Sequence, residues 1–463
     1  MSEEMKTLRK QLLRDSRSGY DVLEEAQLRQ MEDYCADYKA FLGNKTERLS
    51  ARAAIAAAEA HGFVEYRRGM ALEAGDKVYT CNRGKGLMLA VMGRESMAEG
   101  VQIAAAHIDS PRLDLKPNPL YEDSELAYFK THYYGGIRKY QWVTIPLQLQ
   151  GVVVKKDSTA VEVCIGEKGE PQLVITDLLP HLGGEQGKKP LSEAIPAETL
   201  NILLGSRPIG DEDDSDRVKL HVMKRLYDKY GITEADFASA ELEAVPAADA
   251  VDIGIDGSMI GSYGHDDRVC GYAALRALLE LDAPAKTAVC VLADKEEIGS
   301  MGVTGMQSAV FETFLSDLCD SQNVPLKVCF ENSFCLSADV TAAYDPNFAD
   351  VFDKKNAAFL NHGVGLCKYT GARGKSGSSD AGAETVAYVR SLLDGAGVRW
   401  QICELGTVDA GGGGTVAQYM ANRNIATLDA GVPVLSMHAP FEVVAKLDCY
   451  EMYRACKAIY EAR

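Results

Sequence analysis

Short apolar runs alternate with amphipathic stretches along much of this chain. Residues 288–293 are apolar without interruption, whereas residues 20–42 place apolar side chains at helical spacing. A short run of small and β-branched residues is typical of a strand covered on both faces, and helical spacing predicts an amphipathic helix. Strands that alternate with helices predict an α/β fold, here a three-layer sandwich with a mostly parallel central sheet.

The same pattern predicts further elements toward both ends of the chain. A second, alanine-rich helix is expected over residues 47–60. Gly43 and Asn44 form a natural C-terminal stop between the two helices. The other expected strands are residues 77–81, 86–92, 101–107, 326–330, 365–369, 399–405 and 425–429. The other expected helices are residues 264–278, 306–318, 380–393 and 443–459.

The pattern changes in the middle of the chain. Residues 133–138 predict a turn, and residues 143–155, 160–165 and 172–176 predict β-strands. An acidic run then precedes a predicted helix over residues 217–229, where negative charge suits the start of a helix. We therefore expect a β-rich insertion, residues 116–253, which divides an α/β domain into residues 1–115 and 254–463.

Composition narrows the possible partners and the compartment. The 463 residues carry a net charge of −18, which argues against nucleic acid or an anionic membrane as a partner. No segment reaches the roughly 18 uninterrupted apolar residues of a membrane helix, and the N-terminal segment lacks the apolar core of a secretory signal. The 12 cysteines are scattered and form no CxxC motif. Single buried thiols and a cytoplasmic, reducing location are expected.

Two adjacent glutamates close the apolar run of residues 288–293. Glu296 and Glu297 are followed by a glycine, so the strand delivers two carboxylates to its end. Neighbouring side chains at a strand end point in different directions. One glutamate can therefore bind a metal ion while the other serves as a base. A solvated acidic turn is the alternative interpretation.

A second strand end carries His107, with Asp109 two residues later. A carboxylate there can accept a hydrogen bond from the second imidazole nitrogen, the contact that orients a metal-bound histidine. A purely structural histidine is the alternative. Asp266, at the start of the helix over residues 264–278, is either a helix cap or a ligand.

Polar residues of this kind recur where predicted strands end or helices begin. In open α/β sheets, ligands bind beyond the carboxyl ends of the strands. Nitrogen and oxygen donors without thiolates suit a catalytic divalent metal, with zinc expected. Two metal ions would need one bridging aspartate, and one glutamate would remain to accept a proton, as hydrolysis of an amide requires. The candidates are His107, Asp109, Asp266, Glu296, Glu297, Asp339 and His438.

Seven motifs occur in order over nearly the whole chain: HIDSPRLDLKP, THYYGGIRKYQW, GHDDR, DKEEIGS, SADV, GGGGT and SMHAPFE. They resemble those of the aspartyl aminopeptidase family, and the bacterial branch is the closer match. That resemblance implies a di-zinc aminopeptidase acting on peptides, with a preference for N-terminal Asp or Glu as a further expectation. By the resemblance, His107 and Asp339 hold one zinc, Glu297 and His438 hold the other, Asp266 bridges both, Glu296 is the general base, and Asp109 orients His107.

The resemblance also implies an architecture. The insertion would build dimers that assemble into a tetrahedral dodecamer, interrupting a discontinuous catalytic domain. Two departures concern the eukaryotic members: the chain continues differently after YGG, and His181 does not match the register of a histidine that reaches a neighbouring subunit. The departures weaken the transfer of a preference for N-terminal Asp or Glu.

Substrate contacts are expected from two loops. Lys368, with Arg373 and Lys375 as weaker candidates, could pair with an acidic substrate side chain, although a solvated basic loop is the alternative. Gly412 and Gly413 would let the backbone approach a ligand and form a wall of the pocket. The remaining alternatives are a broad-specificity aminopeptidase, a di-zinc carboxypeptidase or deacylase, and a catalytically silent assembly protein.

Overall fold

The chain forms a mixed α/β fold with several sheets, which confirms the predicted α/β class. The computed structural model describes residues 2–14 and 17–463. In that part of the chain, the largest sheet has nine strands in the order β1-β2-β3-β13-β4-β14-β18-β16-β17. Their bounds are β1 (Val64–Glu65), β2 (Lys77–Asn82), β3 (Gly86–Val91), β4 (Gln102–His107), β13 (Ala288–Ala293), β14 (Phe334–Ala338), β16 (Val364–Cys367), β17 (Trp400–Ile402) and β18 (Ala426–Gly431).

The centre of this sheet is parallel. β13, β4, β14 and β18 pair in parallel, as do β1 with β2 and β16 with β17. Antiparallel pairings join β2 to β3, β3 to β13, and β16 to β18. Parallel neighbours end at the same edge, so the residues that follow β13, β4 and β14 are brought together there.

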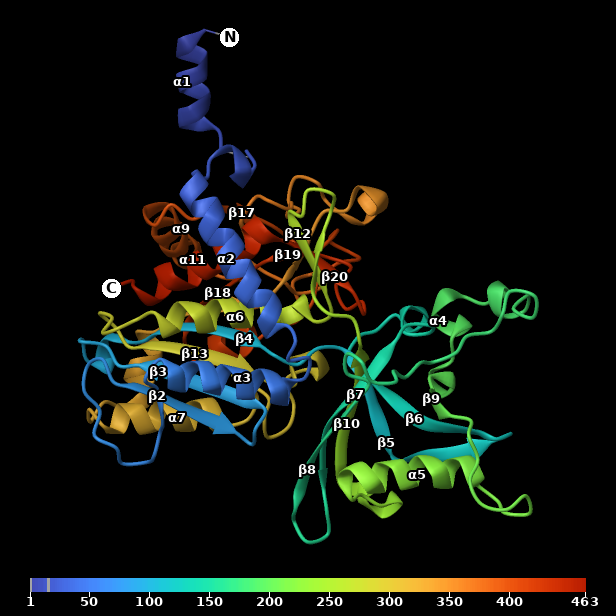
Figure 1. Cartoon of the computed structure of the whole chain (residues 1–463). Coiled ribbons are helices and arrows are strands. Elements are labelled where there is room, and N and C mark those ends of the chain that lie inside the picture. The colour runs from blue at the N-terminus through green and yellow to red at the C-terminus, as the bar shows by residue number, and fades with distance from the viewer. Residues whose placement is uncertain (1, 15–16) are drawn as a thin grey trace.

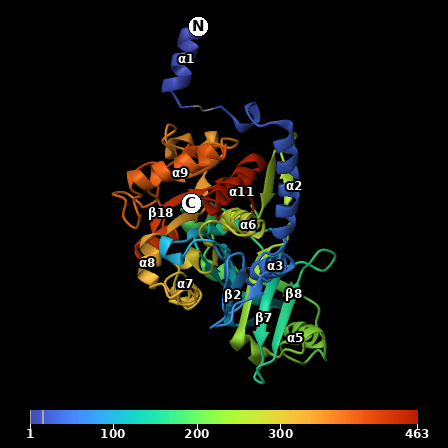
Figure 2. The ribbon, with the colours of Figure 1, turned by 90° about the vertical axis from the view of Figure 1, so that its left-hand side faces the viewer.

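Helices cover the two faces of the nine-stranded sheet. Along β3, Leu87 and Leu89 pack into one apolar cluster, whereas Met88 and Ala90 pack into another, as the alternation of strand side chains requires. Figure 1 shows α7 on the opposite side of the sheet from α2 and α6, and Figure 2 shows α8 next to α7 on that side. The helices are α1 (Glu3–Leu12), α2 (Glu25–Phe41), α3 (Glu47–Ala60), α6 (His265–Leu279), α7 (Val310–Asp320), α8 (Leu326–Glu331), α9 (Ala383–Gly395), α10 (Ala417–Ala421) and α11 (Lys446–Tyr460).

A six-stranded antiparallel sheet lies beside this body, in the order β8-β7-β10-β5-β6-β9 (Figure 1). Its own apolar cluster includes Trp142, Phe129 and Leu226. The elements are β5 (Arg112–Asp123), β6 (Leu126–Tyr134), β7 (Leu147–Val154), β8 (Ala160–Ile165), β9 (Ile202–Gly205), β10 (Ala240–Pro246), α4 (Leu191–Ala194) and α5 (Arg217–Tyr230).

A smaller sheet of five strands has the order β11-β12-β20-β19-β15. Its strands are β11 (Val251–Ile253), β12 (Met259–Ser262), β15 (Thr341–Ala342), β19 (Pro433–Leu435) and β20 (Glu442–Ala445). Among the described residues, no helix has the length and apolar character needed to cross a membrane.

Several predicted elements are wrong. Residues 326–330 form helix α8 rather than a strand: Cys329 and Phe330 are buried together, and the buried strand follows as β14. Residues 172–176 make only isolated bridges. The predicted helix over residues 443–459 begins as strand β20. Strands β5 and β6, which pair with each other, were not predicted. β5 contains two prolines and mixes charged with apolar residues, so it lacks a clear strand pattern.

Candidate metal centre

The ends of adjacent strands position most of the candidate ligands. His107 is the last residue of β4, and Asp339 follows β14 directly. Two residues after β13, the 3-10 helix η7 (Glu296–Ile298) carries both glutamates. Asp266 lies at the start of α6, and His438 follows β19 with a positive φ of 64°. We call His107, Asp266, Glu297, Asp339 and His438 the candidate metal centre.

Asp266 lies between the two histidines. Its Oδ1 is 3.2 Å from His107 Nε2, and its Oδ2 is 3.2 Å from His438 Nε2. Asp339 Oδ1 is 3.8 Å from His107 Nε2, and Glu297 Oε2 is 3.6 Å from His438 Nε2. Each histidine therefore faces one carboxylate of its own and one oxygen of the shared Asp266.

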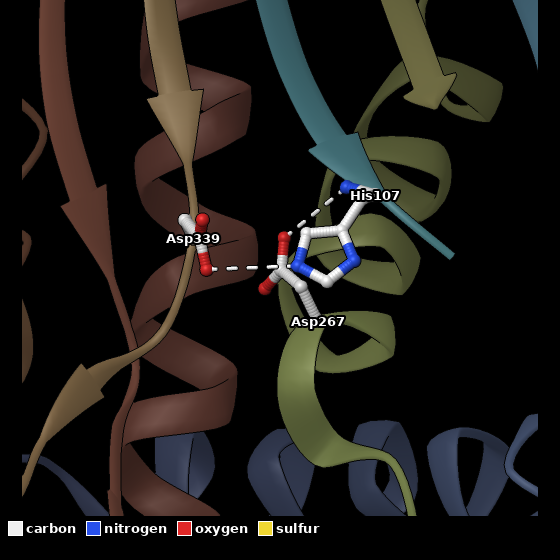
Figure 3. Close-up of side chains that lie close together, drawn as sticks. All are labelled: His107, Asp267 and Asp339. Atoms are coloured by element: carbon white, nitrogen blue, oxygen red, sulfur yellow. Dashed lines mark hydrogen bonds and ion pairs between the residues drawn. The ribbon is translucent and has the colours of Figure 1, made fainter. Parts of the chain in front are cut away.

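A further carboxylate joins this group. Asp267 Oδ2 accepts a hydrogen bond of 3.4 Å from the backbone N–H of His107. Figure 3 shows Asp267, from the start of α6, close to His107 and Asp339. Ligand atoms of these three residues lie within 4.8 Å of one another, as do those of His107, Asp266 and Glu297.

Asp109 organises the backbone around the site. The Nδ1 of His107 is 2.9 Å from the Asp109 carbonyl oxygen and 3.4 Å from its Oδ1. The carboxylate of Asp109 also accepts the backbone N–H groups of Glu296 and Glu297, at 3.1 and 3.2 Å. Tyr134 donates its hydroxyl to Asp109 Oδ2 at 2.8 Å. One buried carboxylate thus connects β4, η7 and β6.

His438 is held from two sides. Its Nδ1 lies 2.8 Å from the carbonyl oxygen of Gly136, and a Cβ at Gly136 would come within 3.2 Å of the same nitrogen. Glu442 is buried and accepts the backbone N–H groups of His438, at 2.7 Å, and of Asp266, at 3.1 Å. Glu442 therefore ties together the two loops that carry these side chains.

The titration of the site follows from burial and from the short contacts. Burial raises the pKa of Glu296 to about 7, although His107 opposes the rise. Burial also raises the pKa of Asp266, but hydrogen bonds from His107 and His438 outweigh it and lower that pKa below its ordinary value. Burial disfavours charged His438, yet Asp266 and Glu297 raise its pKa to about 10. A carboxyl with a pKa near 7 can exchange protons at neutral pH.

The donors fit a divalent cation. Glu297 Oε1 and Asp267 Oδ1 are buried and have no hydrogen-bond partner within the described residues. Unpaired buried carboxylate oxygens are costly unless a cation or a proton compensates them. Imidazole and carboxylate ligands without cysteine match a catalytic zinc site.

A cavity of about 440 Å³ opens onto this group. Gly412 and Gly413 line it, and Gly412 has a φ of 113° and lies so close to Ala372 that a Cβ would collide with that backbone. Lys368 is exposed and is not part of the described wall. Arg373 and Lys375 line an adjoining hollow of about 150 Å³, which shares Thr370, Leu405 and Gly412 with this cavity. His181 lies exposed in a loop.

The family model for the aminopeptidase I zinc metalloproteases (M18) matches residues 44–460. The chain belongs to this family. It is 48% identical over 450 residues to a protein named "Probable M18 family aminopeptidase 1" from Clostridium acetobutylicum, covering 95% of this chain and 97% of that protein. A protein of the same name from Thermotoga maritima is 44% identical over 439 residues, covering 93% and 96%.

Solved structures agree with this assignment. The crystal structure of an M18-family aminopeptidase from Thermotoga maritima has a TM-score of 0.93 at 41% identity, covering 97% of this chain and 99% of that chain. The Saccharomyces cerevisiae mApe1 dodecamer has a TM-score of 0.76 at 21% identity, covering 93% and 99%, and shares the fold. The predictions of the family and of a zinc aminopeptidase are confirmed.

Four residues around the M18 site were not given a role from the sequence. Tyr134 and Gly136 come from the THYYGGIRKYQW motif, Asp267 from GHDDR, and Glu442 from SMHAPFE. The motifs were recognised, but only the three-dimensional contacts distinguish these residues from their neighbours.

Proposed function

We propose that the enzyme binds two divalent metal ions, most simply zinc, and removes the N-terminal residue of peptides. Asp266 would bridge the ions, with His107 and Asp339 on one and Glu297 and His438 on the other. The observation that carries this proposal is that the two oxygens of Asp266 each face a different histidine at 3.2 Å. A single-metal site would not need a carboxylate shared in this way.

Glu296 is the proposed general base. It is close to the candidate metal centre, with Oε2 4.0 Å from His107 Nε2, and its raised pKa suits proton transfer at neutral pH. When bound, the metal ions supply a water of lowered pKa and polarise the scissile carbonyl. Glu296 accepts the proton of the attacking water and delivers it to the leaving amine. Asp109 keeps His107 in the correct tautomer and fixes the backbone of Glu296.

For the substrate, we propose a broad preference that includes neutral N-terminal residues. Val340, Leu405 and Met437 contribute apolar wall, and no lysine or arginine lines the cavity within the described residues. A preference for Asp or Glu would need a cation such as Lys368 to turn toward the substrate.

The architecture belongs to the same proposal. We infer a three-layer sandwich formed by residues 1–115 and 254–463, supported by the two apolar clusters on opposite faces of the nine-stranded sheet. Residues 116–253 would form the dimerisation domain, and dimers would assemble into a tetrahedral dodecamer; the name of the yeast structure supports the number of twelve subunits. A cytoplasmic location is supported by 12 free cysteines.

One assay tests the activity against its rivals. The purified enzyme is incubated with Asp-, Glu- and Leu-initiated peptides and with their N-acetylated forms, with and without a chelator. Chelator-sensitive cleavage of only the free-amine peptides is expected, with Leu cleaved at least as fast as Asp. Cleavage of N-acetylated peptides would favour a carboxypeptidase or deacylase. Absence of chelator-sensitive cleavage would leave an assembly protein.

A further inference from the structure

Two thiols meet in the wall of the substrate cavity. Cys367 is the last residue of β16, and Cys403 follows the last residue of β17. Their Sγ atoms are 3.0 Å apart, and both side chains are buried. Cys367 lines the cavity of the candidate metal centre, so a small solute that enters the cavity can reach this thiol, and Cys403 lies directly behind it.

The strand pairing brings the two backbones close enough for a disulfide. β16 and β17 are parallel, with Leu366 opposite Ile402, and the N–H of Cys403 donates to the Leu366 carbonyl at 3.1 Å. Neighbouring strands lie about 4.8 Å apart, within the roughly 4.4–6.8 Å between Cα atoms that disulfides span. Bond formation therefore needs only a shift of about 1 Å between the sulfur atoms.

We propose that Cys367 and Cys403 form a reversible disulfide when a peroxide enters the cavity, and that this bond changes substrate turnover. One thiol attacks the peroxide: the O–O bond breaks, the sulfur becomes a sulfenic acid, and water leaves. The second thiol attacks that sulfur, so the S–S bond forms and a second water leaves. The two sulfurs together lose two electrons, which the peroxide takes up.

The bond would act on the cavity through two wall segments. Thr370 lies three residues after Cys367 and Leu405 two residues after Cys403, and both line the cavity. Tyr369 donates its hydroxyl to Glu404 Oε1 at 2.6 Å, so a hydrogen bond already links the two segments. The hydrogen bond to Cys403, together with burial, raises the pKa of the Cys367 thiol well above its ordinary value. Because a raised thiol pKa lowers the thiolate fraction that attacks a peroxide, oxidation of the pair should be slow and should require a sustained excess of peroxide.

A second thiol pair provides a matched control. Cys319 and Cys329 also interact through their sulfur atoms, between α7 and α8, but neither lines the cavity. The metal ligands include no cysteine, so oxidation of the Cys367–Cys403 pair leaves the zinc content unchanged. The effect on activity rests on the proposed function, whereas formation of the bond does not.

The experiment treats the zinc-loaded enzyme and the variants Cys403→Ala and Cys329→Ala with hydrogen peroxide. Non-reducing peptide mapping identifies the bond, and kcat/KM on a Leu-initiated peptide is measured before oxidation, after it, and after dithiothreitol. The expected result is a Cys367–Cys403 cross-linked peptide and a change in kcat/KM of at least threefold that dithiothreitol reverses. Cys329→Ala should respond in the same way, and Cys403→Ala should not.

Three results would overturn the proposal: no cross-linked peptide in oxidised, folded enzyme, a cross-link without a change in kcat/KM, or an equal reversible response in Cys403→Ala. Failure of the proposed function looks different. In that case the untreated enzyme cleaves no peptide, while peptide mapping still reports whether the bond forms.

Discussion

Two buried acidic clusters lie near each other in this protein. They differ in the side chains that balance the negative charge of their carboxylates. In the first, which we call the Arg112 cluster, Arg112 pairs with Asp114 at 2.9 Å, Glu243 at 3.2 Å and Glu47 at 3.4 Å. Lys85 adds a second cation 4.0 Å from Glu47. In the candidate metal centre, the ion pairs to carboxylates within the described residues come from histidines.

The difference separates a structural cluster from a functional one. Burying several carboxylates is costly in either place. The Arg112 cluster also has buried oxygens without a hydrogen-bond partner among the described residues, on Glu47 and Glu243, but Arg112 and Lys85 place cations within 4.0 Å of these carboxylates. The candidate metal centre likewise has unpartnered buried oxygens, on Glu297 and Asp267, but among the described residues its carboxylates pair with histidines only, so a cation from outside would compensate their charge. An acid-rich cluster thus indicates a metal site when the chain supplies no lysine or arginine to match it.

The largest effect is expected from Glu296→Gln. If Glu296 is the base rather than a ligand, kcat should fall by about 10³-fold or more, because the amide cannot accept the proton. Zinc content, measured by elemental analysis, should stay close to that of the unmodified enzyme.

His438→Ala is the matched control for Glu296→Gln, because it removes a proposed ligand and should lower the zinc content. Near-normal activity of Glu296→Gln would refute the assignment of the base. Equal loss of zinc in both variants would make Glu296 a ligand instead.

The next largest effect concerns stability. Arg112→Met removes the central cation of the Arg112 cluster, which leaves Asp114 and Glu243 without a cation and Glu47 with Lys85 alone among the described residues. We expect the free energy of unfolding to fall by about 3–5 kcal/mol, measured by denaturant unfolding of the zinc-loaded enzyme. Arg276→Met, which breaks the more exposed pair with Glu280, should cost about 1 kcal/mol or less. Equal losses would show that the Arg112 cluster contributes no more than a surface pair.

The sequence predicted the two kinds of cluster unequally. In the candidate metal centre, the strand pattern placed His107 and Glu297, whereas Asp266 and Asp339 were found through their motifs, because Asp266 starts a helix and the strand before Asp339 was predicted in the wrong place. The Arg112 cluster joins α3, β5 and β10, and β5 was not predicted because of its prolines. Contacts between segments far apart in the chain, such as Glu442 with Asp266, depend on loop geometry rather than on local periodicity. Lys368 was predicted to contact substrate because it stands next to a strand end. That position did not reveal that its side chain is exposed.

The buried carboxylate of Asp429 tests, through the pH dependence of stability, whether a buried carboxylate without a cation destabilises the fold. Asp429 accepts a hydrogen bond from Thr415 at 2.7 Å, while its Oδ2 is buried without a partner in the described chain. Burial raises the pKa of Asp429 to about 6, above the value of about 3.9 expected after unfolding. A raised carboxyl pKa means that the ionised form destabilises the fold. Stability should therefore fall as the pH rises from about 4 to 6 and stay lower above that.

Asp429→Asn should remove this dependence. The expected gain in unfolding free energy is about 2–3 kcal/mol at pH 7.5, with little difference at pH 4, measured by denaturant unfolding at both pH values. An equal effect at the two pH values would show that the charge of Asp429 is not responsible.

Tyr134 joins the two clusters, and its replacement should have the smallest effect. Its ring lies 4.0 Å from the Arg112 guanidinium, and its hydroxyl donates to Asp109. Tyr134→Phe keeps the ring, so stability should change by about 1 kcal/mol. Asp109 would lose one of the donors that fix it beside Glu296, so kcat should fall about tenfold with KM little changed. Tyr263→Phe, which removes a hydroxyl bonded to the Pro111 carbonyl, should cost similar stability without that loss of kcat. If both variants lose activity equally, the hydroxyl of Tyr134 only stabilises the fold and does not position Asp109.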